Sequence, residues 1–184
     1  MTRVGNSLGM LIYRAMGAAM LDRSMYEGIE HDPRATGQAL TVVLASSVAA
    51  GIGGGGWSGP RPVTLLLIAG VALASWLAWA IMIQQIGGRF LAEPQTRVDL
   101  GELLRTIGFA ASPGLLQVLA WIPTITTAVF IASWVWMLVA MTVAVRQALD
   151  FKTFGHALAV CAVALAIVLG LAFLIALTIT RGVA

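Results

Sequence analysis

The chain has 184 residues, of which 59% are hydrophobic and 10% are charged. An average soluble domain is about half apolar and about a quarter charged, so this composition excludes a water-soluble globule. Residues 62–88 and 106–145 contain no charged side chain, which is typical of segments surrounded by hydrocarbon. We therefore predict an all-α protein that crosses a membrane several times.

The charged residues indicate the setting of the protein. The net charge is +3, but the basic residues lie between apolar runs, where they orient a membrane protein rather than bind nucleic acid. Ten of the eleven are Arg and only Lys152 is Lys, a bias that GC-rich codons impose, so we expect a bacterial inner membrane protein. Cys161 is the single cysteine, and His31 and His156 lack further ligands at metal-binding spacing. We therefore expect no metal and no cofactor.

Residues 1–34 form a predicted amphipathic segment. Apolar side chains recur at helical spacing over residues 4–32, but charged residues interrupt them, so the segment is too polar to cross a bilayer. We expect a helix that lies in the headgroup plane and ends at Pro33. Its apolar positions are Val4, Leu8, Leu11, Ile12, Ala15, Ala19 and Met20.

Residues 35–184 form a predicted membrane domain with five spans. The first run ends in four glycines, Gly53 to Gly56, which hold a helix poorly and which we interpret as a flexible external turn. The uncharged run between Arg105 and Arg146 is about twice as long as one helix needs, so it folds back on itself. Pro123 favours a turn at residues 121–124. The five spans cover about 35–52, 63–86, 105–122, 124–145 and 156–180.

The connector at residues 87–104 carries a signal for the start of a helix. Asp99 followed three residues later by Glu102 has the spacing of a capping box. We expect this pair to open the third membrane helix.

The distribution of basic residues predicts an orientation. With five spans, two basic residues, Arg61 and Arg181, fall on one side of the membrane and nine fall on the other. Because Lys and Arg accumulate in cytoplasmic loops, the N-terminus is predicted to be cytoplasmic and the C-terminus extracytoplasmic. The nine are Arg3, Arg14, Arg23, Arg34, Arg89, Arg97, Arg105, Arg146 and Lys152.

The predicted spans offer packing signals but little chemistry. No Asp, Glu, Lys or Arg lies deep in a predicted span, which argues against an ion-coupled transporter. The side-chain amide of Gln117 has more hydrogen-bonding groups than its own helical turn can satisfy. We therefore expect this amide to reach a neighbouring helix or the carbonyl freed near Pro113. Small residues spaced by four predict three contact stripes: Gly70, Ala74 and Ala78; Ala128, Ala132, Ala140 and Ala144; and Ala162, Ala166 and Gly170.

Four tryptophans lie within predicted spans and not at the membrane interface, where Trp is usual. They either pack against helices and lipid or face a partner protein, a pigment or a quinone, and both interpretations stay open. The four are Trp76, Trp79, Trp134 and Trp136.

The sequence has no motif of a known catalytic site. Neither a G-x-S-x-G turn nor an H-E-x-x-H helix occurs, and the glycine cluster is not followed by the Lys and Ser or Thr of a phosphate-binding loop. We predict that the protein is not an enzyme.

A family resemblance is carried by the third and fourth spans. The stretch from Leu103 to Pro113, followed by residues 134–145 and the link 146–150, resembles the YIP family of small membrane proteins named for their interaction with Ypt/Rab GTPases. The shared motif is a Gly, an aromatic residue, three further residues and a Pro, here Gly108, Phe109 and Pro113. The likeness covers about residues 34–177, but the acidic segment that precedes the spans in eukaryotic members has no counterpart.

The resemblance implies a non-enzymatic membrane protein with a five-span layout that binds other membrane proteins or shapes the bilayer, and it supplies no catalytic residues. Three hypotheses follow: a YIP-like scaffold or membrane-organising protein, an accessory subunit of a larger membrane complex such as an energy-converting one, and a channel or carrier. The last is disfavoured by the uncharged spans. Interaction candidates are Gly108, Phe109, Pro113, Gln117, Trp134 and Trp136.

Overall fold

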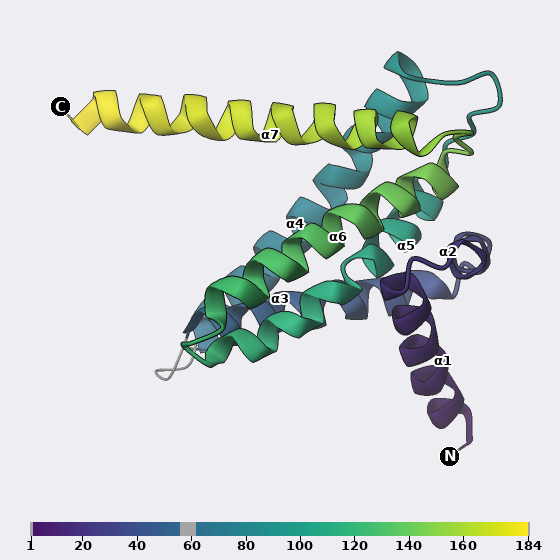
Figure 1. The fold of residues 1–184 in the computed structure, drawn as a ribbon, viewed down its shortest axis with the longest axis horizontal. Coiled ribbons are helices and arrows are strands. Elements are labelled where there is room, and N and C mark those ends of the chain that lie inside the picture. Colours follow the sequence, from purple (N-terminus) through teal and green to yellow (C-terminus); the bar gives the residue numbers. More distant parts are fainter. Residues whose placement is uncertain (1, 56–61, 184) are drawn as a thin grey trace.

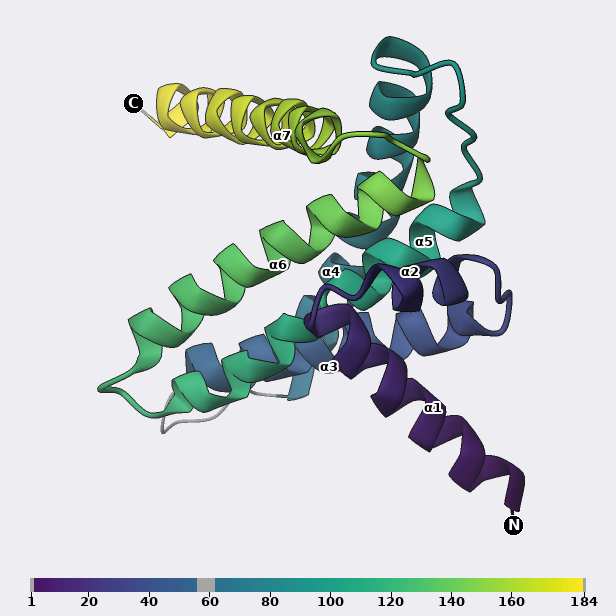
Figure 2. The same cartoon turned by 45° about the vertical axis from the view of Figure 1, so that its right-hand side comes forward.

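The computed structural model describes residues 2–55 and 62–183, with side chains over residues 7–55 and 62–170. The fold is all-α, as predicted. Helices pack side by side in a slanted bundle, and the first and last helices project from it (Figures 1 and 2). In chain order the elements are α1 (Thr2–Ala19), α2 (Arg23–Glu30), α3 (Ala35–Gly55), α4 (Pro62–Gln85), η2 (Ile86–Phe90), α5 (Leu100–Ala110), η3 (Ser112–Trp121), α6 (Thr126–Ala148) and α7 (Phe154–Val183).

Within the described part of the chain, four helical segments are long and apolar enough to cross a membrane. They correspond to the first four predicted spans. The fifth predicted span falls in α7, whose first part, Phe154–Gly170, is apolar but shorter than a span. The four segments are Ala35–Gly55, Pro62–Phe90, Leu100–Trp121 and Thr126–Ala148.

The N-terminal segment consists of two helices, so the prediction of one helix over residues 4–32 is wrong. The break lies at Leu21, whose φ of 62° is incompatible with a continuing right-handed helix. Asp22 then caps α2 by accepting hydrogen bonds from the backbone N–H and the hydroxyl of Ser24. α1 projects away from the bundle, whereas α2 is packed against it and buries Tyr26 and Ile29 (Figure 2).

The glycine-rich end of the first span is helical and not a turn as far as Gly55; Gly56 lies outside the described residues. The reason is a close approach between two backbones. A Cβ atom on Gly53 would lie 2.0 Å from the carbonyl oxygen of Gln117 in η3, so only glycine fits. Gly53 therefore allows α3 and η3 to pack closely.

The hairpin of the third and fourth spans follows the local signals closely. Asp99 caps α5 by accepting a hydrogen bond from the backbone N–H of Glu102 at 3.0 Å, as predicted, although the helix starts before the predicted span. After Ala111 the helix changes to the tighter winding of η3. The chain then turns at residues 122–125 and returns as α6, close to the predicted turn.

Two apolar clusters form the core. One joins α4, α5, α6 and the start of α7, and the other joins α1, α2, α3, α5 and α6. α7 packs through Ala157, Val160, Cys161 and Ala164 and then leaves the bundle (Figure 1). Of the predicted small-residue stripes, only Ala140 and Ala144 are buried within the chain, whereas the other eight positions are exposed.

Candidate functional site

The Gly-aromatic-Pro motif lies where α5 passes α3. A Cβ atom on Gly108 would come within 2.8 Å of the Cβ of Ala39, so the absent side chain allows the two helices to touch. Phe109 is fully buried in the second core cluster, and Pro113 is buried at the first turn of η3. The motif thus forms a structural joint.

Polar side chains satisfy the backbone where the helix changes winding. Because Pro113 has no N–H, the carbonyl of Phe109 lacks its usual donor. The hydroxyl of Ser112 donates to that carbonyl at 2.6 Å. From α3, the hydroxyl of Ser46 donates to the carbonyl of Ala111 at 2.9 Å. The irregular backbone is therefore compensated locally and by a neighbouring helix.

Gln117 joins two helices, which is one of the two arrangements expected for it. Its Nε2 donates to the hydroxyl of Ser133 in α6 at 3.0 Å, and both side chains are buried. Ser133 in turn donates to the carbonyl of Phe130. A buried amide that links helices in this way contributes about 0.6 kcal/mol in measured membrane proteins.

The four intramembrane tryptophans have different surroundings. Trp76 donates its indole N–H to the carbonyl of Leu104, and Trp136 donates to the carbonyl of Ala19 at the end of α1. Trp134 points outward from α6 with 58% of its surface exposed, and its N–H has no acceptor among the described residues. Trp79 packs against the first core cluster, and its buried indole N–H has no hydrogen-bond partner among the described residues. Two of the four rings thus bond to other helices of the chain, whereas the ring of Trp134 is exposed.

Comparison with known proteins identifies the family. A family model of the Yip1 domain matches residues 18–176, which is most of the chain. The chain belongs to the Yip1 family. No curated protein and no solved structure matches it.

The match covers the joint at Gly108 and Pro113, so the predicted family resemblance is confirmed. Together with the apolar helices, it identifies a multi-pass membrane protein.

One end of this Yip1 protein carries a polar network that the sequence analysis missed. Arg105 is only 9% exposed, and its Nε and one terminal nitrogen both donate to the carbonyl oxygen of Glu30, at 3.0 and 2.5 Å. The guanidinium thereby caps the C-terminal end of α2 and fastens it to α5. The predicted third span began at Arg105, whereas the structure places Arg105 inside the apolar segment Leu100–Trp121. The residues are 75 apart in sequence, so no local pattern indicated the contact.

At the same end, the connector between η2 and α5 contacts the link between α6 and α7. The backbone N–H of Lys152 donates to the carboxylate of Glu93 at 3.2 Å, and His156 lies 3.4 Å from that carboxylate. A second ring nitrogen of His156 is 2.9 Å from the carbonyl of Leu91. Within residues 7–55 and 62–170, no three His, Cys, Asp or Glu side chains are placed to hold a metal ion.

Glu30 is a buried carboxyl group at the end of α2. It is 6% exposed, and its Oε2 atom has no hydrogen-bond partner among the described residues. Burial raises its pKa from 4.5 to about 7, and the charges of Glu102 and Asp150 act in the same direction. The charge of His31 and a hydrogen bond with Gln147 oppose the rise of the pKa. Glu30 therefore titrates near neutral pH.

The raised pKa predicts a pH-dependent stability. The folded state holds the proton of Glu30 more tightly than the unfolded state, so stability should rise as the pH falls from about 8 towards 5. Glu30→Gln removes the cost of burying the charge. We expect it to stabilise the protein at pH 8, by an amount on the order of 2 kcal/mol, and to have little effect at pH 5. Thermal unfolding of the full chain in detergent at both pH values measures this.

The matched control is Glu27→Gln, which removes an exposed carboxylate from the same helix. The melting temperature of this variant should change with pH in the same way as that of the wild type. Equal effects of Glu30→Gln at the two pH values would contradict the assignment.

Proposed function

We propose that this Yip1 protein is a non-enzymatic scaffold that packs against other integral membrane proteins through the outer face of α6. The observation that carries the proposal is the exposure of Trp134 within an apolar helix long enough to cross a membrane. Tryptophan is usual at membrane interfaces, where its N–H finds an acceptor, and not within the hydrocarbon. A neighbouring protein would cover the ring and supply that acceptor.

The roles of the other polar groups support this proposal. Ser46, Ser112 and Gln117 each bind a backbone carbonyl or a side chain of the same chain, so they hold the bundle together. Family membership adds no catalytic residue to them. An internally bonded bundle that exposes an aromatic ring on α6 suits a protein that binds other membrane proteins.

We further propose a bacterial inner membrane location with five crossings, the N-terminus in the cytoplasm and the C-terminus outside. The biased distribution of basic residues supports this orientation, since nine of eleven fall on one side of a five-span arrangement. The contacts between α2, α5 and the connectors are consistent with a common side for these segments. α7, at 30 residues, is long enough for the fifth crossing.

The scaffold proposal is tested by crosslinking in native membranes. A photoreactive amino acid in place of Trp134 is expected to give a protein adduct of constant size, which mass spectrometry identifies as an integral membrane protein. Leu66 in α4 is the control position, because it is 73% exposed on another helix. Adducts with lipid alone at position 134, or the same protein adducts from both positions, would reject the proposal.

A further inference from the structure

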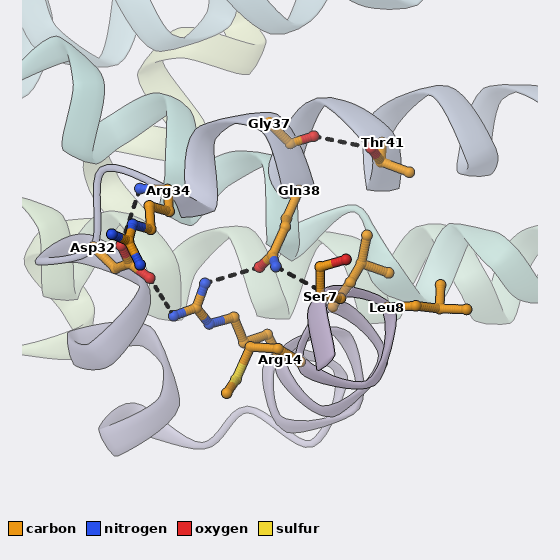
Figure 3. Close-up of a pocket in the computed structure, with 10 residues that line it drawn as sticks. Ser7, Leu8, Arg14, Asp32, Arg34, Gly37, Gln38 and Thr41 are labelled. Atoms are coloured by element: carbon orange, nitrogen blue, oxygen red, sulfur yellow. Dashed lines mark hydrogen bonds and ion pairs between the residues drawn. The ribbon is translucent and has the colours of Figure 1, made fainter. Parts of the chain in front are cut away.

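A groove of about 740 Å³ lies between α1 and α3, at the start of the first span. Figure 3 shows Arg14 reaching from α1 towards Asp32 and Gln38. The guanidinium donates to Asp32 at 2.6 Å and to the amide oxygen of Gln38 at 2.8 Å. The lining also includes Leu8, Met10 and Leu11 from α1 and Arg34 from the link before α3.

The polar residues that line the groove have an excess of positive charge. Its ionised side chains are Arg14, Arg34 and Asp32, so the groove carries a net charge of about +1. The hydrogen bond from Arg14 is the main cause that lowers the pKa of Asp32, so the carboxylate stays ionised and holds Arg14 in place. Asp32 uses its other oxygen for the backbone N–H of Arg34 and not for the guanidinium. The charge of one guanidinium is thus uncompensated, which suits a singly charged anion.

Part of the groove lining is apolar. Leu8, Met10 and Leu11 line it from α1, and Leu8 is 60% exposed. Ile12 and Met16 continue the exposed apolar surface one and two turns beyond Leu8. A surface of this kind is covered by acyl chains when a helix lies at the membrane interface.

The groove also lies at the end of a membrane helix, where lipid headgroups are expected. Arg34 directly precedes α3, the first membrane helix, and Gln38 is one turn inside it. Arginine side chains at the ends of membrane helices extend to the headgroup region. Positive charge, an apolar wall and this position all fit one amphipathic ligand.

We propose that the groove between α1 and α3 binds an anionic phospholipid, with Arg14 and Arg34 holding the phosphodiester and Leu8 and Leu11 contacting an acyl chain. Guanidinium groups match the paired oxygens of a phosphodiester. A free phosphate ion would use the basic residues but gain nothing from the leucines. The bound lipid would fasten α1 to the membrane surface beside α3.

The experiment uses the full chain in detergent, titrated with dioleoyl phosphatidylglycerol and, separately, dioleoyl phosphatidylcholine, while native mass spectrometry counts the bound lipid. Arg34→Gln is expected to weaken phosphatidylglycerol binding about fivefold, the effect of one basic residue near a membrane surface. Arg89→Gln is the control, because it removes an exposed Arg from η2 and should leave binding unchanged. Equal losses in the two variants, or equally tight binding of phosphatidylcholine, would overturn the proposal.

Two further measurements distinguish a bound lipid from a bound free anion. Inorganic phosphate is expected to displace phosphatidylglycerol poorly, and Leu8→Ser should weaken lipid binding while Leu66→Ser does not. Both leucines are exposed, so neither change disturbs the core. Displacement of the lipid by millimolar phosphate, together with an unchanged affinity in Leu8→Ser, would assign the groove to a free anion and contradict the proposal.

Discussion

Gly53→Ala is expected to destabilise the protein strongly, although it adds a single methyl group. The new Cβ would lie 2.0 Å from the backbone oxygen of Gln117 and 2.9 Å from the side chain of Ala120. A backbone oxygen cannot rotate away, so α3 and η3 must separate along their contact. Overpacking of a core costs about 1–3 kcal/mol, and we expect a value at the upper end of this range.

The control for this prediction is Gly70→Ala, the same substitution in α4, where nothing lies within 4 Å of the new Cβ. Because Ala favours a helix over Gly by up to about 1 kcal/mol, this variant should be at least as stable as the wild type. Thermal unfolding of the full chain in detergent, followed by size-exclusion chromatography, distinguishes the two. Equal melting temperatures for both variants would mean that α3 and η3 do not touch at Gly53.

Arg105→Met is the second change expected to have a large effect. It removes both donors to the carbonyl of Glu30 and takes a positive charge from a buried position near that residue. Hydrogen bonds from charged groups contribute about 1.5–3 kcal/mol, so we expect a loss of about 3 kcal/mol. Arg105→Lys should fall in between, because an ammonium keeps the charge but not the fork of two N–H groups.

The melting temperature and the rate of tryptic cleavage at Arg23 and Arg34 measure this effect, since Arg23 begins the helix that Arg105 fastens and Arg34 lies four residues beyond its end. Faster cleavage in Arg105→Met than in the wild type is expected. Arg89→Met is the control, because it removes an exposed Arg from η2. If the cleavage rate were the same in both variants, Arg105 would not hold α2 in place.

Local signals in the sequence predicted much of the fold. Asp99 caps α5 because an acidic side chain reaches the N–H three residues later, which spacing alone reveals. The turn near Pro123 and the carbonyl freed near Pro113, which accepts from Ser112, both follow from a missing N–H. The start of α2 was also readable, since Asp22 has the chemistry of an N-cap residue, but the apolar spacing across it suggested one continuous helix.

The long-range contacts could not be predicted in the same way. A glycine fits an open turn and a tight helix contact equally well, and only the residue opposite Gly53 decides between them. Arg105 looked like the charged boundary of a span, because its acceptor is a backbone carbonyl that carries no residue-specific signal. Of the candidate residues, the structure brings Gly108, Phe109 and Pro113 together at one joint and leaves Trp134 apart from it.

The tighter winding of η3 affects how far the chain reaches. A helix with three residues per turn advances about 2.0 Å per residue, against about 1.5 Å in an α-helix. The ten residues of η3 therefore extend about 20 Å, about 5 Å more than α-helical winding would give. Measured along the chain, Arg105 and Trp121 are then separated by about 30 Å, the thickness of a hydrocarbon core. The tighter winding of η3 thus gives seventeen residues a reach that an α-helix of the same number of residues would not have.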